Sequence, residues 1–428
     1  MKFSKLKFSL QRIKQSSLAR HTLWMLISRG LRIFAQAFYF VIIARVLGVE
    51  QYGAFIGATA LVAILSPYGS LGLGNLIVKN VTVNRSLFAV YWGNALFMIC
   101  ASAAILTGVL IGAGQIFLPA TISWWLIFLV AITDLLFIKL IDISGQAFQA
   151  FHWLSRTAQL SALPYITRVL AALSLVYLFP QPDAVDWAYV SLGSTAFAAI
   201  IAVSFVHFNL GAPQLQLSRI KPEILEGFYF SIGLSAQTIY NDIDKTMLAR
   251  MASLEATGIY AAAYRLIDVS FVPVGSLLAA AYAKFFQQGA SGIRGSLKLA
   301  KKLLPLAAMY SAVAGIGLFF LAPIVPYILG DEYRVAVEAL RWLAPLPFLK
   351  AMHYFAADTL TGAGYQGLRS GMQIIVAIFN VLINLWIIPL YSWRGAALSS
   401  LASDSLLMVC LWLLVAFLCQ KSVKHTQI

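Results

Sequence analysis

A run of polar residues crosses an otherwise apolar stretch near the middle of the chain. Its members recur at intervals of four, three, four and three residues: Ser231, Ser235, Thr238, Asp242 and Lys245. An α-helix would place all five on one face. Asp242 and Lys245 could form an ion pair that only fixes the helix. The hydroxyl groups leading to this pair favour a face that lines a water-accessible cavity, because ionisable groups in hydrocarbon cost roughly 2.5–3.5 kcal/mol each.

A second polar stripe lies near the N-terminus. Arg29, Arg32, Gln36 and Tyr39 are three, four and three residues apart, which again places them on one helical face. Arg29 could equally extend its long side chain to the lipid headgroups. Arg32 lies deeper in the apolar stretch, and we expect it to face the interior.

Other apolar stretches also carry ionisable side chains, including Arg168 and His353. We expect His353 to be a hydrogen-bonded core residue. Two basic residues have an aspartate three positions further on, so these pairs could be purely structural: Lys139 with Asp142, and Arg265 with Asp268.

These buried groups form two predicted sets. The set expected to line a substrate cavity is basic or polar: Arg29, Arg32, Gln36, Lys139, Lys245, Arg265 and Lys350. The acidic set is expected to couple an ion gradient or to form structural pairs: Asp134, Asp142, Asp242, Asp244, Asp268, Asp358 and Asp404. A basic lining suits an anionic cargo such as a phosphate or pyrophosphate, whereas a pathway for protons alone would favour carboxylates. Any driving gradient would act through Asp242, Asp244 or Asp134, and the sequence leaves open whether the ion is a proton, sodium or neither.

Motifs of enzymes are weak in this chain. Asp242 and Asp244 match the DxD pattern of glycosyltransferases, but helix positions two apart point to nearly opposite faces and chelate one metal poorly. The sequence contains no Gly-rich phosphate loop, HExxH motif or nucleophile elbow. Cys100, Cys410 and Cys419 lack metal-binding spacing. We therefore predict no metal, no cofactor and no enzymatic activity.

The elements that must position these residues are membrane helices. Of the 428 residues, 61% are hydrophobic and 11% are charged. Apolar stretches of roughly 20 residues, the length that crosses a bilayer, recur along the whole chain. The sequence predicts an all-α membrane protein with twelve spans, at residues 22–46, 54–77, 87–112, 122–147, 158–179, 187–207, 227–250, 257–282, 303–329, 339–361, 371–390 and 396–419.

The basic residues are distributed unevenly between the predicted loops. Of 31 lysines and arginines, 19 fall in the termini and in one alternate set of loops, against at most five in the other set. Cytoplasmic loops carry such an excess. We therefore predict a bacterial inner-membrane protein with a cytoplasmic leader over 1–20 and a cytoplasmic tail over 421–428. The net charge of +15 then reflects topology rather than nucleic-acid binding.

A short pattern recurs at an offset of 205 residues. The first copy contains Ala44, Arg45, Glu50, Gly53 and Phe55, and the second contains Ala249, Arg250, Glu255, Gly258 and Tyr260. Each copy joins one predicted helix to the next. Because six helices separate the copies, both halves would share one orientation, as in transporters with a substrate site between two lobes. We predict lobes at 21–215 and 216–420.

Two segments resemble a known family. They are ARVLGVEQYGAF over 44–55, followed by the turn over 71–75, and NDIDKTMLARMASLEATGIYAAAYRL over 241–266. They resemble the O-antigen and polysaccharide flippases of the multidrug/oligosaccharidyl-lipid/polysaccharide exporter superfamily. The resemblance implies a MATE-like fold of two six-helix lobes around a basic cavity, with cavity residues at Arg29, Arg32, Lys245 and Arg265.

The same resemblance implies a substrate and a mechanism. The substrate would be an oligosaccharide on undecaprenyl pyrophosphate, a polyprenyl-pyrophosphate carrier, exported by alternating access. Membrane lipid and other polysaccharide assembly proteins are further candidate partners. A multidrug exporter of organic cations stays open, although interior basic groups disfavour it. A membrane-embedded polymerase or ligase would need a large outer loop with arginines, and a scaffold role also stays open.

Overall fold

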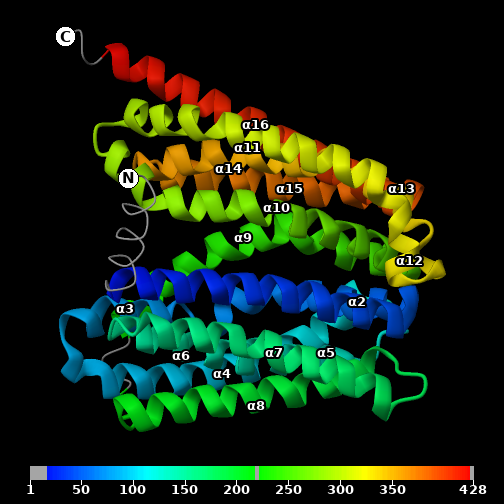
Figure 1. Ribbon diagram of the computed structural model, residues 1–428, viewed down its shortest axis with the longest axis horizontal. Helices are drawn as coiled ribbons and strands as arrows, with labels where there is room; N and C mark the ends of the chain where they lie inside the picture. The colour runs from blue at the N-terminus through cyan, green and yellow to red at the C-terminus, as the bar shows by residue number, and fades with distance from the viewer. Residues whose placement is uncertain (1–16, 217–220, 425–428) are drawn as a thin grey trace, which may run out of the picture. The chain divides into compact units, whose positions relative to one another are not determined.

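The structure, a computed structural model, is built from helices (Figure 1). It describes residues 17–216 and 221–424, except for the side chains of 17–33, of 221–236 other than Phe228, Ser231 and Ser235, and of 422–424. Within these residues every regular element is a helix, and none is a strand. The predicted all-α class is confirmed.

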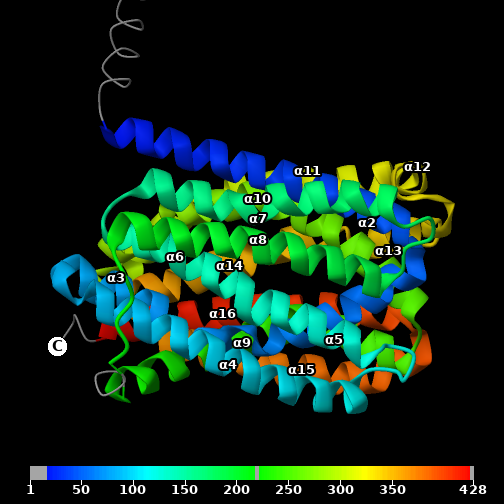
Figure 2. The ribbon, with the colours of Figure 1, turned by 90° about the horizontal axis from the view of Figure 1, so that it is seen from below.

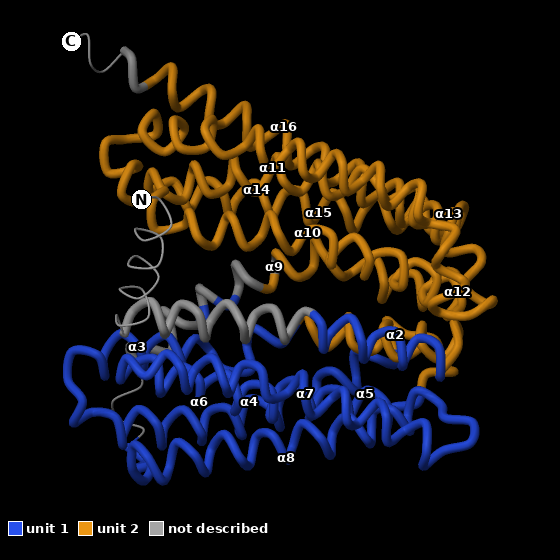
Figure 3. The backbone as a smooth tube through the Cα atoms, in the orientation of Figure 1, with its two compact units in different colours: residues 1–46, 65–115, 123–232 blue, residues 47–64, 116–122, 233–428 orange. Residues whose placement is uncertain are grey.

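The chain divides into two compact units, which Figure 3 shows in different colours. Unit 1 comprises residues 1–46, 65–115 and 123–232, and unit 2 comprises 47–64, 116–122 and 233–428. Two short segments from the first half of the chain thus belong to unit 2. The division into lobes at residues 215 and 216 stays a prediction.

The first half of the chain contains seven α-helices among the described residues: α2 (Ser17–Leu65), α3 (Leu73–Val83), α4 (Phe88–Phe117), α5 (Trp124–Ala131), α6 (Lys139–Ala150), α7 (Leu154–Leu178) and α8 (Ala184–Leu210). In unit 1, α6, α7 and α8 pack against one another (Figures 1 and 2). Their core includes the fully buried Trp92 of α4, Phe148 of α6 and Val206 of α8.

The second half contains eight more described α-helices: α9 (Lys221–Met251), α10 (Leu254–Gly289), α11 (Ile293–Leu321), α12 (Val325–Leu329), α13 (Ala336–Leu343), α14 (Leu346–Gly362), α15 (Gln366–Tyr391) and α16 (Trp393–Lys424). In unit 2, α14 packs against α10, α11 and α16. Most of its residues are buried, including the polar Lys350, His353 and Asp358. A polar residue on α14 therefore needs a partner from a neighbouring helix.

Two spans predicted in the first half of the chain are not continuous α-helices. The span predicted over 54–77 ends at Leu65 and is followed by a 3-10 turn with Pro67 near its start. α3 then begins after Gly72, whose φ of 68° lies in the left-handed region that suits glycine. The span predicted over 122–147 contains seven π-helical residues, Ile132–Ile138.

The remaining departures occur at prolines and glycines. α2 is two helices that meet at Gly48, where φ is 71°. The predicted span 303–329 begins earlier, at Ile293, and its helix ends at Leu321 before a 3-10 turn that contains a proline. The predicted span 339–361 is divided between α13 and α14 just before Pro345, which cannot donate a backbone hydrogen bond.

Eight helical segments of the described chain are long and apolar enough to cross a membrane: Phe34–Val83, Arg85–Phe117, Leu154–Leu178, Ala184–Leu210, Leu254–Gly289, Ile293–Leu329, Gln366–Tyr391 and Trp393–Lys421. The first of these contains the break at Gly48. Its 50 residues would extend about 75 Å as one straight helix, far more than the roughly 30 Å of a bilayer core. The chain is a multi-pass membrane protein, and the number of twelve crossings stays a prediction.

Candidate functional site

Two buried lysines of unit 2 face the same tyrosine ring. Lys245 lies on α9, Lys350 on α14 and Tyr264 on α10. Each ammonium nitrogen lies 4.4 Å from the centroid of the Tyr264 ring, close enough for a cation–π attraction. The two lysines are only 8% and 6% exposed. Three helices thus bring two positive charges to one aromatic ring in the interior of the unit.

Each of these lysines also has a carboxylate partner. Lys245 Nζ lies 2.5 Å from Asp242 Oδ1, one helical turn away, and Lys350 Nζ lies 3.2 Å from Asp268 Oδ1 of α10. The aspartate side chains are 35% and 45% exposed, against 10% and 7% for the lysine side chains. The carboxylates are therefore more accessible than the ammonium groups. An anion that reached them would compete with them for the ammonium groups.

Asp404 of α16 is a buried carboxylate with hydrogen-bonding partners from two other helices. The Tyr240 hydroxyl of α9 donates to Asp404 Oδ1, and Nε2 of His353 on α14 lies 2.8 Å from the same oxygen. Asp404 is 2% exposed and His353 is 3% exposed. The expectation that His353 is a hydrogen-bonded core residue is confirmed. Hydrogen bonds from several donors are what makes a buried carboxylate tolerable.

Asp244, the residue directly before Lys245, forms a similar arrangement. Its Oδ2 accepts hydrogen bonds from the hydroxyl of Tyr260 on α10 and, at 3.1 Å, from Ser400 Oγ of α16. Asp242 instead pairs with Lys245, so the two aspartates of the DxD pattern have different partners, as their helical spacing predicts. Within the described chain, no group of three His, Cys, Asp or Glu residues could hold a metal ion.

In unit 1, the described ion pair among the predicted residues joins Arg168 of α7 to Asp134, at 3.5 Å. Asp134 lies in the π-helical segment Ile132–Ile138. Such segments are frequent at functional sites because they change the direction of the side chains that follow. Asp134 therefore keeps two interpretations, a structural pair and a functional carboxylate.

The other predicted residues differ in exposure and in their described partners. Gln36, Lys139 and Arg265 are half-buried, and Asp142 is exposed. Asp358 of α14 pairs instead with Arg369 of α15 at 3.6 Å, a contact that ties these two helices together. The side chains of Arg29 and Arg32 lie outside the described residues.

Sequence reasoning missed the tyrosines of this cluster. Tyr260, Tyr264 and Asp268 recur every four residues and share one face of α10, and the rings of the two tyrosines lie 5.6 Å apart. The same spacing argument that selected the stripe on α9 could have found them. Tyr240 and Ser400 had no such signal, because their partner Asp residues lie on other helices.

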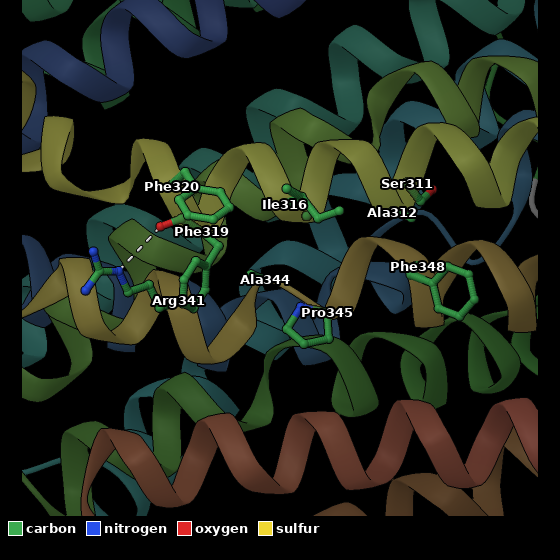
Figure 4. A pocket seen from close by; sticks show the side chains of 10 residues that line it. Ser311, Ala312, Ile316, Phe319, Phe320, Arg341, Ala344, Pro345 and Phe348 are labelled. Carbon is green, nitrogen blue, oxygen red and sulfur yellow. Dashed lines mark hydrogen bonds between the residues drawn. The ribbon is translucent and has the colours of Figure 1, made fainter.

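A separate hollow of unit 2 is almost entirely apolar. It has a volume of about 330 Å³ and lies between α11 and the α13–α14 segment, with Phe319, Phe320 and Phe348 among its lining residues (Figure 4). Its one charged side chain, Arg341, donates to the Phe319 carbonyl at 3.4 Å. None of the predicted site residues lines it. This hollow is therefore not the candidate site.

Comparison with known proteins identifies the family. Residues 18–283 match the family model described as "Polysaccharide biosynthesis protein". A relative from Escherichia coli (strain K12), named "Putative O-antigen transporter", is 22% identical over 401 residues, which cover 91% of this chain and 94% of the relative.

Solved structures share the fold. One is described as "Inward-facing conformation of a multidrug resistance MATE family transporter of the MOP superfamily", with a TM-score of 0.75 and 14% identity, over 94% of this chain and 100% of that chain. Another MOP superfamily transporter, from Pyrococcus furiosus, has a TM-score of 0.63 and 15% identity, over 93% of this chain and 95% of that chain. Since the family match covers more than half of its length, the chain belongs to the polysaccharide biosynthesis protein family, and it has the fold of the MATE transporters.

Proposed function

We propose that this protein is a transporter, not an enzyme, and that it moves a lipid-linked oligosaccharide across the bacterial inner membrane with both termini in the cytoplasm. The family, the name of the Escherichia coli relative and the exporter fold support this proposal. The cargo would be an oligosaccharide on undecaprenyl pyrophosphate, carried by alternating access through a basic cavity.

The observation that carries the proposal is the pair of lysines on the Tyr264 ring. A pyrophosphate has negative charge on two adjacent phosphoryl groups, and two ammonium groups in one place suit such an anion. Removing a charged group from water costs several kcal/mol unless charged partners replace the lost hydration. Lys245 and Lys350 would supply those partners.

The two more exposed aspartates would pair with the lysines when no cargo is bound. Asp242 and Asp268 each occupy one ammonium group, so neither lysine is buried without a partner. The phosphoryl groups would replace these carboxylates, which are exposed enough to be solvated after release. Cargo binding would thus be an exchange of anionic partners, which lowers its desolvation cost.

The wider basic lining and the ion coupling belong to the same proposal. Arg29, Arg32, Gln36, Lys139 and Arg265 would line the rest of the cavity. Asp404 and Asp244 are suited to ion coupling because their side-chain partners are hydroxyl groups and an imidazole rather than a lysine or arginine. A carboxylate of this kind can take up a proton without releasing a lysine or arginine.

One observation favours a second function, export of organic cations. The cluster contains the two lysines but four aspartates, Asp242, Asp244, Asp268 and Asp404, so its formal charge is not positive. A cation could bind the partly exposed carboxylates of Asp242 and Asp268. The family match and the relative's name favour the glycan cargo over this alternative.

Reconstitution in liposomes tests the proposal. A labelled undecaprenyl-pyrophosphate oligosaccharide is placed in one leaflet, and its arrival in the other is followed with an enzyme or quencher that cannot cross the bilayer. We expect protein-dependent movement of this lipid and no movement of a fluorescent organic cation. Efflux of the cation without movement of the lipid would establish the second function instead.

A further inference from the structure

A second pocket of unit 2, with several polar residues in its lining, lies where α10 ends and α11 begins. Its volume is about 460 Å³. Its lining comes from the last turns of α10, the connecting turn and the first turns of α11: Lys284, Gln288, Ser291, Gly295, Lys298, Leu299 and Lys302. It shares no residue with the cluster around Tyr264, so it needs a separate explanation.

The pocket is strongly basic. Lys284, Lys298 and Lys302 are all exposed, and none of them forms a salt bridge with a described residue. The sequence contains no aspartate or glutamate between residues 269 and 330, so neither helix offers these lysines a local carboxylate. Three ammonium groups therefore surround one hollow without a described carboxylate partner, and an anion from outside the chain could bind them.

The start of α11 adds further hydrogen-bond donors to this end of the unit. The residue that precedes the helix, Gly292, has a φ of 91° and no side chain to cap the first backbone N–H groups. The uncapped N-terminus of a helix carries partial positive charge and donates readily to phosphate oxygens. It strengthens a site that the lysines already define.

The exposed face of α11 continues from this pocket as an apolar stripe. After Lys298 and Lys302, at spacings of three and four residues, come exposed apolar side chains: Leu306, Met309, Val313, Ile316 and Phe320. The stripe from Leu306 to Phe320 extends about 21 Å, which exceeds the roughly 15 Å depth of one leaflet. A charged head and an apolar tail could therefore bind the same helix face.

We propose that this pocket binds the phosphate headgroup of an anionic phospholipid, whose acyl chains lie along the apolar stripe of α11. The lysines recognise the phosphate by charge, as basic pockets between membrane helices do. The excess of basic residues in this predicted loop places the pocket in the cytoplasmic leaflet. The bound lipid would hold the α10–α11 end of the unit at headgroup level. This assignment is independent of the cargo proposed above.

Native mass spectrometry of the purified full-length protein tests this site. The probes are the anionic lipid phosphatidylglycerol and, at equal concentration, the zwitterionic lipid phosphatidylcholine. We expect tight retention of phosphatidylglycerol only, and a roughly 30-fold weaker affinity in the double variant Lys298→Gln/Lys302→Gln. Equal retention of both lipids by the unaltered protein would overturn the proposal.

A matched variant separates a specific pocket from general surface charge. Lys301 and Lys421 are also exposed. They lie at the same end of the unit, since Arg294 at the start of α11 donates to the Cys419 carbonyl of α16 at 3.3 Å. We expect Lys301→Gln/Lys421→Gln to retain phosphatidylglycerol within about threefold of the unaltered protein. An equal loss of affinity for phosphatidylglycerol in both double variants would overturn the proposal that this pocket binds the lipid.

A competition arm distinguishes a lipid from a free phosphate. Inorganic pyrophosphate should not displace phosphatidylglycerol at equal concentration, because it has no chains to bind the stripe of α11. Displacement by pyrophosphate would reassign the pocket to a soluble phosphate ligand. Lipid retention is measured without transport, so its result does not depend on the identity of the cargo.

Discussion

Gly53 of α2 and Gly258 of α10 pack against each other's helix in the same way. A Cβ atom at Gly53 would lie 1.8 Å from the carbonyl oxygen of Leu254, and one at Gly258 would lie 2.0 Å from that of Val49. Each carbonyl belongs to the residue four positions before the other glycine. Val49 and Leu254 differ by the repeat offset of 205, as the glycines do. The two copies of the sequence repeat therefore meet in a symmetric contact within unit 2.

This contact predicts that neither glycine tolerates a methyl group. Gly53→Ala or Gly258→Ala would force the two backbones apart, and overpacking of this kind typically costs about 1–3 kcal/mol. We expect a lower midpoint of thermal unfolding in detergent and a lower yield of folded protein for both variants. Because each clash is with a backbone carbonyl, a side-chain rotation cannot relieve it.

Gly275 provides the matched control on the same helix. A Cβ atom at Gly275 would meet nothing within 4 Å. Alanine is a better helix former than glycine by roughly 1 kcal/mol, so Gly275→Ala should leave the midpoint unchanged or raise it. An unchanged midpoint in Gly258→Ala as well would contradict the predicted close contact between α2 and α10.

A pH-dependent contact is expected between α13 and α16. Arg394 Nε and Nη2 donate to the two carboxylate oxygens of Glu338, at 3.0 and 2.8 Å. This hydrogen bonding lowers the pKa of Glu338 below its ordinary value of 4.5. A lowered folded-state pKa contributes stability that is present above pH 4.5 and is lost as the pH falls through the folded-state value.

The measurement compares thermal unfolding at neutral pH with unfolding below pH 4. We expect Glu338→Gln to lose less stability on acidification than the unaltered protein, with a small difference because the pair is half-exposed. Arg394→Gln should reproduce the effect. An unchanged response to acid in both variants would show that the pair does not contribute.

The sequence predicted contacts along a helix better than contacts between helices. The spacing of Asp242 and Lys245 was enough to identify a possible ion pair, which the structure contains, because one helix determines both positions. The pair of Lys350 with Asp268 spans 82 residues, and nothing in the sequence joins α14 to α10. For the same reason the sequence offered Asp268 only Arg265, its neighbour along the helix, as a possible partner, and the structure adds Lys350.

Breaks in the predicted helices were partly visible in the sequence. Pro67, Gly72 and Pro345 are residues that end or interrupt helices, and the structure changes direction or helix type near each of them. The π-helical segment Ile132–Ile138 had no such marker. It contains neither proline nor glycine, so no residue within it indicated the change of helix type.

Asp404 is expected to be necessary for the packing of α16. Asp404→Leu would leave the Tyr240 hydroxyl and His353 Nε2 without their shared acceptor, and a buried unsatisfied polar group costs about 1–3 kcal/mol. We expect Asp404→Leu to lower the unfolding midpoint strongly, whereas Asp404→Asn keeps an acceptor oxygen and should remain folded.

Transport by the folded Asp404→Asn variant, measured with and without a proton gradient, then reports on ion coupling. Gradient-dependent transport at the unaltered rate would remove Asp404 from that role.

The lysines on the Tyr264 ring should determine affinity for an anionic cargo. Lys245→Gln/Lys350→Gln removes both ammonium groups, and we expect a loss in affinity for lipid-linked pyrophosphate on the order of tenfold or more for each lysine, since hydrogen bonds to charged groups contribute about 1.5–3 kcal/mol. Asp242 and Asp268 are partly exposed, so water can solvate them in the variant and the protein should stay folded.

Tyr264→Phe is the matched control, because it keeps the aromatic face that both ammonium groups contact. Binding of lipid-linked pyrophosphate to the purified protein, measured by native mass spectrometry, should fall in the lysine variant and persist in the phenylalanine variant. Undiminished binding in the lysine variant would exclude Lys245 and Lys350 from cargo recognition.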